Sequence, residues 1–174
     1  SRAIDGNFDG LWGNSSVTHT PDQANSWWEV QLVSARPIHE VRLYNRADCC
    51  WTRLSNFRVS VHQGATEVWG SDHFVGTGNV PAGQSYTIFP PSNTVADRVR
   101  VELLGLNNDG TGVLSLAEVE VVEHGALPQF ELAQLGTATQ SSLGSGGVPS
   151  RAIDGTLDGF WTNGSVSHTS DQPS

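Results

Sequence analysis

The chain has 174 residues, which is long enough for one well-buried domain and too short for two of ordinary size. Its 18 carboxylates outnumber its 9 lysines and arginines, and the resulting net charge of −9 argues against nucleic-acid binding, which needs a basic face. No segment approaches the ~20 consecutive apolar residues of a membrane span, so we expect no membrane insertion.

Short segments in which apolar and polar residues alternate with a period of two run through most of the chain. This alternation is typical of strands that bury one face, and no stretch of about a dozen residues keeps a helical period. Clusters of Gly, Pro, Asn and Asp separate the segments at 76–79, 90–93 and 107–110. The pattern predicts an all-β protein, a sandwich of antiparallel sheets. The predicted strands span residues 28–33, 38–44, 57–61, 86–89, 99–103 and 116–122.

The beginning of the chain recurs near its end, at an offset of 149 residues. Residues 1–23 and 150–172 are identical at 16 of 23 positions, which chance cannot explain. The repeat unit therefore has the length of a domain and not of a solenoid repeat. We expect the chain to start inside one copy and to end inside the next. The predicted domains are 1–123, a first domain without its opening strand, then a linker at 124–130 and the N-terminal part of a second copy at 131–174.

Residues 132–140 have the pattern of an opening strand for the second copy, and the first copy has no counterpart. A sandwich that lacks one strand exposes an unpaired edge. We hypothesise that residues 131–149 complete the first domain, either within one chain or by strand exchange with a second chain or a tandem repeat.

The most distinctive group of residues follows the second predicted strand. Arg46 and Arg53 bracket Asp48 and two adjacent cysteines, Cys49 and Cys50. Two guanidinium forks that converge can hold the oxygens of a sugar, with Asp48 orienting them, although a solvated surface ion-pair cluster has the same composition. The cysteines are either two small buried side chains or a strained vicinal disulfide, which needs an oxidising compartment.

Two residues of interest lie in the repeated segment: His19, which recurs as His168, and Trp12, which recurs as Trp161. A single loop histidine is usually a polar surface residue. A tryptophan in this position is either part of the core or a platform for the apolar face of a sugar.

The segment from Asp5 to Gly10 alternates carboxylate, amide and glycine in a tight turn. Such a turn suits a hard cation that seeks oxygen ligands, although it is not an EF-hand, because Ser16 stands where that loop needs a bidentate Glu. A plain turn is the alternative. Templates for nucleophilic and metal-dependent catalysis are missing, and a glycosidase pair of Asp5 and Asp9 is less favoured than cation binding, so we expect no enzyme.

Taken together, these residues resemble the F-type lectin (fucolectin) family. The family motif is a His, then Arg-x-Asp-Cys-Cys and a further basic residue. Here it is His19, Arg46-Ala-Asp48-Cys49-Cys50 and Arg53. The stretches Ser-Arg-Ala-Ile-Asp-Gly-Asn, Val-Thr-His-Thr, Trp-Trp-Glu-Val and Ala-Glu-Val-Glu-Val are similar to that family too, so the resemblance covers nearly all of the chain.

The resemblance implies a jelly-roll β-sandwich of the galactose-binding-like, discoidin-related type, secreted, that binds α-L-fucose on fucosylated glycans. It implies that His19, Arg46 and Arg53 bind the ring oxygen and hydroxyls, that a Cys49–Cys50 disulfide offers an apolar surface, and that Trp12 lies near the sugar's methyl group. It also implies a structural Ca²⁺ whose ligands match Arg2, Asp5, Asn7, Ser16, Ala117 and Glu118.

The second copy stops before any Arg-x-Asp-Cys-Cys, so at most one complete fucose site per chain is expected. Two other functions fit the same pattern. One is the fucose-binding module of a glycan-degrading enzyme, with identical local chemistry. The other is a discoidin-like adhesion domain for protein or lipid headgroups.

Overall fold

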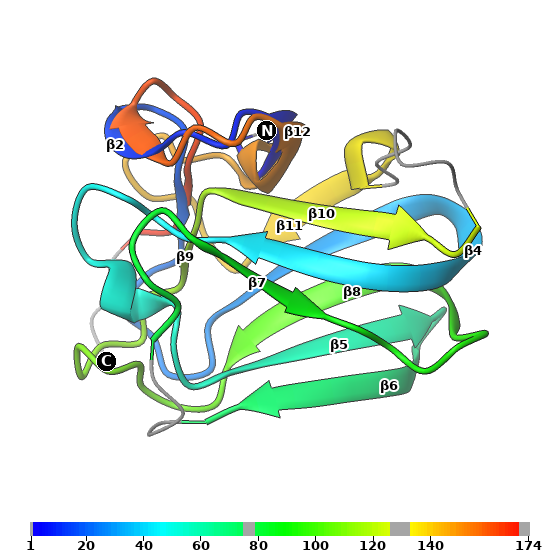
Figure 1. Ribbon diagram of the computed structural model, residues 1–174. Helices are drawn as coiled ribbons and strands as arrows, with labels where there is room; N and C mark the ends of the chain where they lie inside the picture. Colours follow the sequence, from blue (N-terminus) through cyan, green and yellow to red (C-terminus); the bar gives the residue numbers. More distant parts are fainter. Residues whose placement is uncertain (1, 75–78, 126–132, 171–174) are drawn as a thin grey trace.

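The structure is a computed structural model that describes residues 2–74, 79–125 and 133–170. Its main sheets are antiparallel and pack face to face, and the described residues include three short 3₁₀ helices: η1 (Trp51–Arg53), η2 (Ala133–Leu135) and η3 (Pro149–Ala152) (Figure 1). The predicted all-β sandwich is confirmed. Within the described residues, no helix is long and apolar enough to cross a membrane.

The larger sheet is built around the first half of a long strand, β4 (Trp27–Tyr44). All of its pairings are antiparallel. Its strand order is β11 (Thr137–Gln140), β4, β8 (Val95–Leu103), β5 (Phe57–Gln63) and β6 (Thr66–His73).

The second half of β4 belongs to the opposite sheet, between β10 (Glu118–Glu123) and β7 (Ser85–Ile88). The strands predicted at 28–33 and 38–44 are thus one continuous strand. It changes sheet where its pairing with β8 shifts register between Gln31 and Arg36, a stretch in which residues 33–36 are exposed.

The core lies between the two sheets and is formed by the alternate residues that the period-two pattern marks. Along β4, Trp28, Val30 and Leu32 are buried in turn, and Val41 and Leu43 continue the apolar face in the second half. Successive side chains of a strand point to opposite faces, so alternation in the sequence becomes burial on one side. The cluster also contains Phe57, Val59, Val61, Val99, Val101, Leu103, Val119 and Val121.

Several strands differ from the sequence predictions. Strand β6 was not predicted, because its residues are mostly exposed or half-buried and carry no apolar stripe. The strand predicted at 116–122 is split into β9 (Ser115–Leu116) and β10, and between them Ala117 donates its N–H to the Tyr44 carbonyl at 2.9 Å.

The strand predicted at 132–140 is shorter than expected. Residues 133–135 form η2, and β11 follows and pairs antiparallel with Trp28–Gln31 of β4. Gly136 joins the two, at a point where a side chain would press on the Gln31 carbonyl. Most of the predicted linker 124–130 lies outside the described residues.

The two copies of the repeated segment lie together at one end of the sandwich, blue and orange in Figure 1. The first contributes β1 (Ile4–Gly6), β2 (Gly10–Asn14) and β3 (Thr18–His19), and the second β12 (Ile153–Gly155), β13 (Phe160–Thr162) and β14 (Ser167–His168). Strands β1 and β12 run parallel with Asp5 opposite Asp154, and β3 and β14 both pair with β9.

Candidate functional site

The site is built on the loop that leaves β4 after Tyr44. The side chain of Asn45 is buried and donates to two carbonyls, those of Trp51 at 2.8 Å and Val80 at 2.6 Å. These bonds close the loop onto itself and onto a neighbouring segment. The N–H of Ala47 reaches the Gly10 carbonyl at 2.9 Å, which ties the loop to the N-terminal segment.

Asp48 organises one half of the site. Its carboxylate accepts from Arg46 Nε at 2.5 Å and Arg46 Nη2 at 3.2 Å, from the peptide N–H of Trp12 at 2.9 Å and from that of Cys49 at 2.8 Å. The Arg46 side chain is only 5% exposed, so burial lowers its pKa while Asp48 counteracts the shift. The guanidinium stays charged, because its ordinary pKa is so high.

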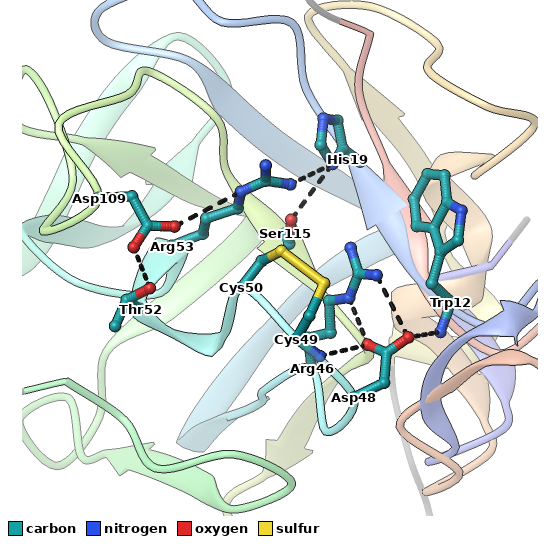
Figure 2. The surroundings of a disulfide bond; sticks show 10 residues. All are labelled: Trp12, His19, Arg46, Asp48, Cys49, Cys50, Thr52, Arg53, Asp109 and Ser115. Atoms are coloured by element: carbon teal, nitrogen blue, oxygen red, sulfur yellow. Dashed lines mark hydrogen bonds and ion pairs between the residues drawn. A yellow bond between two sulfur atoms is a disulfide. The ribbon is translucent and has the colours of Figure 1, made fainter.

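Cys49 and Cys50 form a disulfide between adjacent residues, which settles the alternative that the sequence left open. Cys50 has φ 57°, in the left-handed region, and directly precedes η1. Figure 2 shows the disulfide between the Arg53–His19 pair on one side and the group of Arg46, Asp48 and Trp12 on the other.

Arg53, at the end of η1, forms the other half of the site. Its Nη1 lies 3.1 Å from Nδ1 of His19, and its Nε lies 3.8 Å from Oδ2 of Asp109. Ser115 Oγ is 3.4 Å from the same histidine nitrogen, and Thr52 donates its hydroxyl to Asp109. The imidazole and guanidinium are thereby oriented from two sides.

Trp12 lies beside both halves of the site. Its ring stands edge-on to His19 with centroids 5.5 Å apart, and Arg46 Cζ is 4.9 Å from its ring centroid. The structure therefore brings together every residue that the sequence singled out for sugar binding. The supporting residues Asn45, Asp109 and Ser115 were missed, since nothing in their local sequence sets them apart.

This arrangement offers a dense set of hydrogen-bond donors beside two apolar surfaces. The guanidiniums present fixed N–H forks, the disulfide and the indole present apolar faces, and Asp48 and Asp109 neutralise part of the positive charge. Such a surface suits a small neutral molecule with several hydroxyls and one apolar edge.

Only some of the residues that were predicted to bind a cation lie close together. A carboxylate oxygen of Asp5 lies within 4.8 Å of one of Glu118, and so does an oxygen of Asp154, the counterpart of Asp5 in the second copy. Asp5 keeps an exposed face, yet burial of its carboxylate raises its pKa to about 9, an effect that Arg2 partly offsets. Oxygen donors that need positive charge fit a hard cation such as Ca²⁺.

The other predicted ligands lie at different distances from this group. The N–H of Asn7 donates to Asp5 Oδ1 at 3.0 Å, and Ala117 directly precedes Glu118. Ser16 donates its hydroxyl to the Leu11 carbonyl at 2.9 Å. The Arg2 guanidinium lies over the ring of Trp161, with Cζ 4.5 Å from its centroid.

Comparison with known proteins places the chain and its fold in a family. Residues 2–101 match the family profile of the NedA-like, galactose-binding domain. Fucolectin-6 of Anguilla japonica is 34% identical over 121 residues, which cover 70% of this chain and 61% of that protein.

Two solved structures are similar over most of the chain. The lectin domain of lectinolysin, complexed with Lewis B antigen, is 37% identical with a TM-score of 0.62, over 71% of this chain and 83% of that chain. An F-lectin from Morone saxatilis (striped bass) serum is 36% identical with a TM-score of 0.59, over 88% and 52% of the two chains.

The chain spans less than two thirds of the length of the curated fucolectins it matches. The profile match covers more than half of the chain, and the similar structures share its sandwich. The expected jelly-roll sandwich of the galactose-binding-like, discoidin-related type is therefore confirmed, and the chain belongs to the F-type lectin (fucolectin) family.

Proposed function

We propose that this chain is a non-catalytic lectin domain that binds terminal α-L-fucose between Arg46, Arg53 and His19. The observation that carries the proposal is the convergence of these three side chains around the Cys49–Cys50 disulfide. The names of similar proteins support it, since they include fucolectins and a lectin domain complexed with Lewis B antigen.

Each group has a distinct role in this proposal. The two guanidiniums and the imidazole donate hydrogen bonds to the ring oxygen and hydroxyls of the sugar. The disulfide and Trp12 receive its apolar edge and methyl group, so that water is displaced from both. Asp48 keeps Arg46 in its orientation and lowers the net positive charge, which suits a neutral ligand.

Specificity follows from the buried donors. A sugar that misplaces one hydroxyl leaves a donor unpaired, at a cost of about 1–3 kcal/mol. A small ligand with few contacts binds weakly, with a Kd between ~1 µM and ~1 mM. Fucosylated glycans that carry several terminal residues would be bound more tightly through avidity if sites are linked. A secreted location follows from the disulfide, which persists in oxidising compartments.

Titration calorimetry tests the sugar site. The oxidised protein in Ca²⁺ should give saturable heat with L-fucose and little with galactose. Arg53→Ala should abolish this heat, whereas Arg36→Ala should not, because Arg36 is exposed and bonds on the surface to Ser34 Oγ at 3.2 Å and to Glu123 at 3.6 Å. No heat with fucose from folded, oxidised protein would contradict the proposal.

We further propose that a structural Ca²⁺ stabilises the loop that carries Trp12 and His19. Asp5 and Glu118 would hold it with Asn7, and the backbone carbonyls of Arg2 and Ala117 and an oxygen of Ser16 would complete the set. The ion would supply the positive charge that the clustered carboxylates need, and would thereby fix the loop that forms one wall of the sugar site.

Thermal unfolding in Ca²⁺ and in chelator tests the cation. Calcium should raise the Tm of the unaltered protein and should not raise that of Glu118→Gln. Glu123→Gln, on the same strand but ion-paired with exposed Arg36, should respond like the unaltered protein. Calorimetry with Ca²⁺ alone on the unaltered protein covers the case in which Glu118→Gln fails to fold, and the absence of binding heat there would contradict the proposal.

A further inference from the structure

The two copies of the repeated segment lie in one place on the sandwich. The isolated bridges Asn7–Thr156, Ser16–Ser165 and Val17–Val166 and the three pairs of β1 with β12 all join a residue to its counterpart 149 positions on. Both copies also use the same partners. Thr18 and Ser167 pair with Leu116, and His19 and His168 pair with Ser115, in the same antiparallel sense.

Shared hydrogen-bond partners extend this coincidence. Glu118 Oε1 accepts from the N–H groups of Gly6, at 3.2 Å, and of Gly155. The Ala47 N–H donates to the carbonyls of Gly10 at 2.9 Å and Gly159 at 3.3 Å. Glu118 Oε1 and the Ala47 N–H therefore each bond to the same backbone group of either copy.

Van der Waals contact prevents both copies from filling this place at once. The ring centroids of His19 and His168 lie 2.6 Å apart, and those of Trp12 and His168 lie 3.2 Å apart. Aromatic rings pack with centroids about 4.5–7 Å apart. A Cβ on Gly10 would also fall on the backbone of Gly159. One molecule therefore holds one copy or the other here.

Both copies have the internal bonds that shape the segment. Asp9 accepts from the Leu11 N–H at 2.9 Å, as Asp158 does from the Phe160 N–H at 2.9 Å. The Asn14 and Asn163 amides donate to the second oxygens of these aspartates. Neither copy lacks what it needs to adopt the conformation.

Each copy also has its own connection to the sandwich. The first continues directly into β4, and the second follows η3 and, before it, β11, which pairs with β4. Arg2 lies just before the strands of the first copy, and Val148 lies just before η3. The Arg2 N–H donates to the Val148 carbonyl at 2.6 Å. The entry to both copies is at the same point of the fold.

We infer that residues 2–20 and 151–169 of one chain exchange as alternative occupants of this place, and that His168 replaces His19 beside Arg53 when the second copy is bound. Strand β11 stays paired with β4 in both states, and so keeps the second copy close to the place that the two copies share. Either copy then supplies one tryptophan, one histidine and one aspartate. The chain therefore has a single sugar site, and one side of that site is formed by whichever copy is bound.

Hydrogen exchange tests the competition without any sugar. Gly6 and Gly155 have φ of +76° and +78°, where valine is strained. Gly6→Val should speed amide exchange in 2–20 by about tenfold and slow it in 151–169. Gly155→Val should do the reverse, as the matched variant.

The outcomes of this experiment are distinct. A change confined to the altered copy, or global unfolding of Gly6→Val, would overturn the inference. So would a shift that grows with protein concentration, because the second copy would then come from a neighbouring chain.

Fucose calorimetry tests the interchange of the histidines, and this arm rests on the proposed function. For equally populated copies, His19→Ala and His168→Ala should each weaken binding by about twofold, because half of the competent molecules remain. The double variant should lose binding. If His19→Ala alone abolishes binding, the interchange is wrong. If the unaltered chain does not bind fucose, the proposed function fails and the exchange experiment still decides the inference.

Discussion

Replacement of Asp48 by alanine is the substitution that the site geometry makes most consequential. It removes the acceptor of two Arg46 bonds and of the Trp12 and Cys49 N–H groups, and it leaves Arg46, whose side chain is 5% exposed, as an uncompensated buried charge. Breaking a buried pair in this way costs about 3–5 kcal/mol. Because the Asp48 side chain is itself 29% exposed, we expect the lower end, about 3 kcal/mol of unfolding free energy.

Asp72→Ala is the matched control. Its side chain is also 29% exposed, but its partner Arg58 is 27% exposed and also pairs with Glu67, so the loss of Asp72 leaves no unpaired buried charge and should cost about 1 kcal/mol or less. Urea unfolding at pH 7 measures both values, and Asp48→Ala should also lower the Tm by about 6–12 °C. Equal costs for the two variants would refute the reasoning that Arg46 depends on Asp48.

Three further predictions concern the core, the pH dependence and the disulfide. Phe57→Ala should lower the unfolding free energy by about 3–5 kcal/mol in urea, since its ring is fully buried between the sheets, and a loss below about 1 kcal/mol would contradict this. Burial, together with the Arg98 charge, lowers the pKa of His62 in the folded chain. As the pH falls, the unfolded chain therefore binds a proton at a higher pH than the folded chain does, and the free energy of unfolding should decrease below pH ~6.5. His62→Gln should show a smaller fall in urea midpoint between pH 7.5 and 5.5, and an unchanged fall would count against the assignment. Changing Cys49 and Cys50 together to serine should weaken fucose binding in calorimetry by removing the apolar ring, and undiminished affinity would exclude that role.

The strands that bury one face could be predicted from the sequence, and the others could not. Trp28, Val30 and Leu32 alternate with polar residues, and this pattern became the core face of β4. Strand β6 has no buried face, so its sequence shows no alternation of apolar and polar residues. It forms through its hydrogen bonds to β5. The continuity of β4 through its exposed middle likewise depends on its partners in both sheets.

The site residues could be predicted where they share one short motif. Arg46 and Asp48 lie in the loop after β4 and Arg53 lies at the end of η1, and their side chains lie on either side of the disulfide. The groups that orient them come from far along the chain: Asp109 lies 57 residues beyond Thr52, and Ser115 lies 96 beyond His19. Only the folded sandwich brings such residues together.

The repeat could be found in the sequence, but its structural consequence could not. Identity at an offset of 149 predicts two segments with the same conformation. It does not predict that both reach one place, which depends on β11 pairing with β4 and so carrying the second copy to the position of the first.

The most direct test of the central claim is a crystal structure of the oxidised protein grown with L-fucose and Ca²⁺. The account predicts fucose against the Cys49–Cys50 disulfide, with its ring oxygen and hydroxyls in hydrogen-bond range of Arg46, Arg53 and an imidazole. Fucose bound at another surface, or no fucose at this site at saturating concentration, would contradict it.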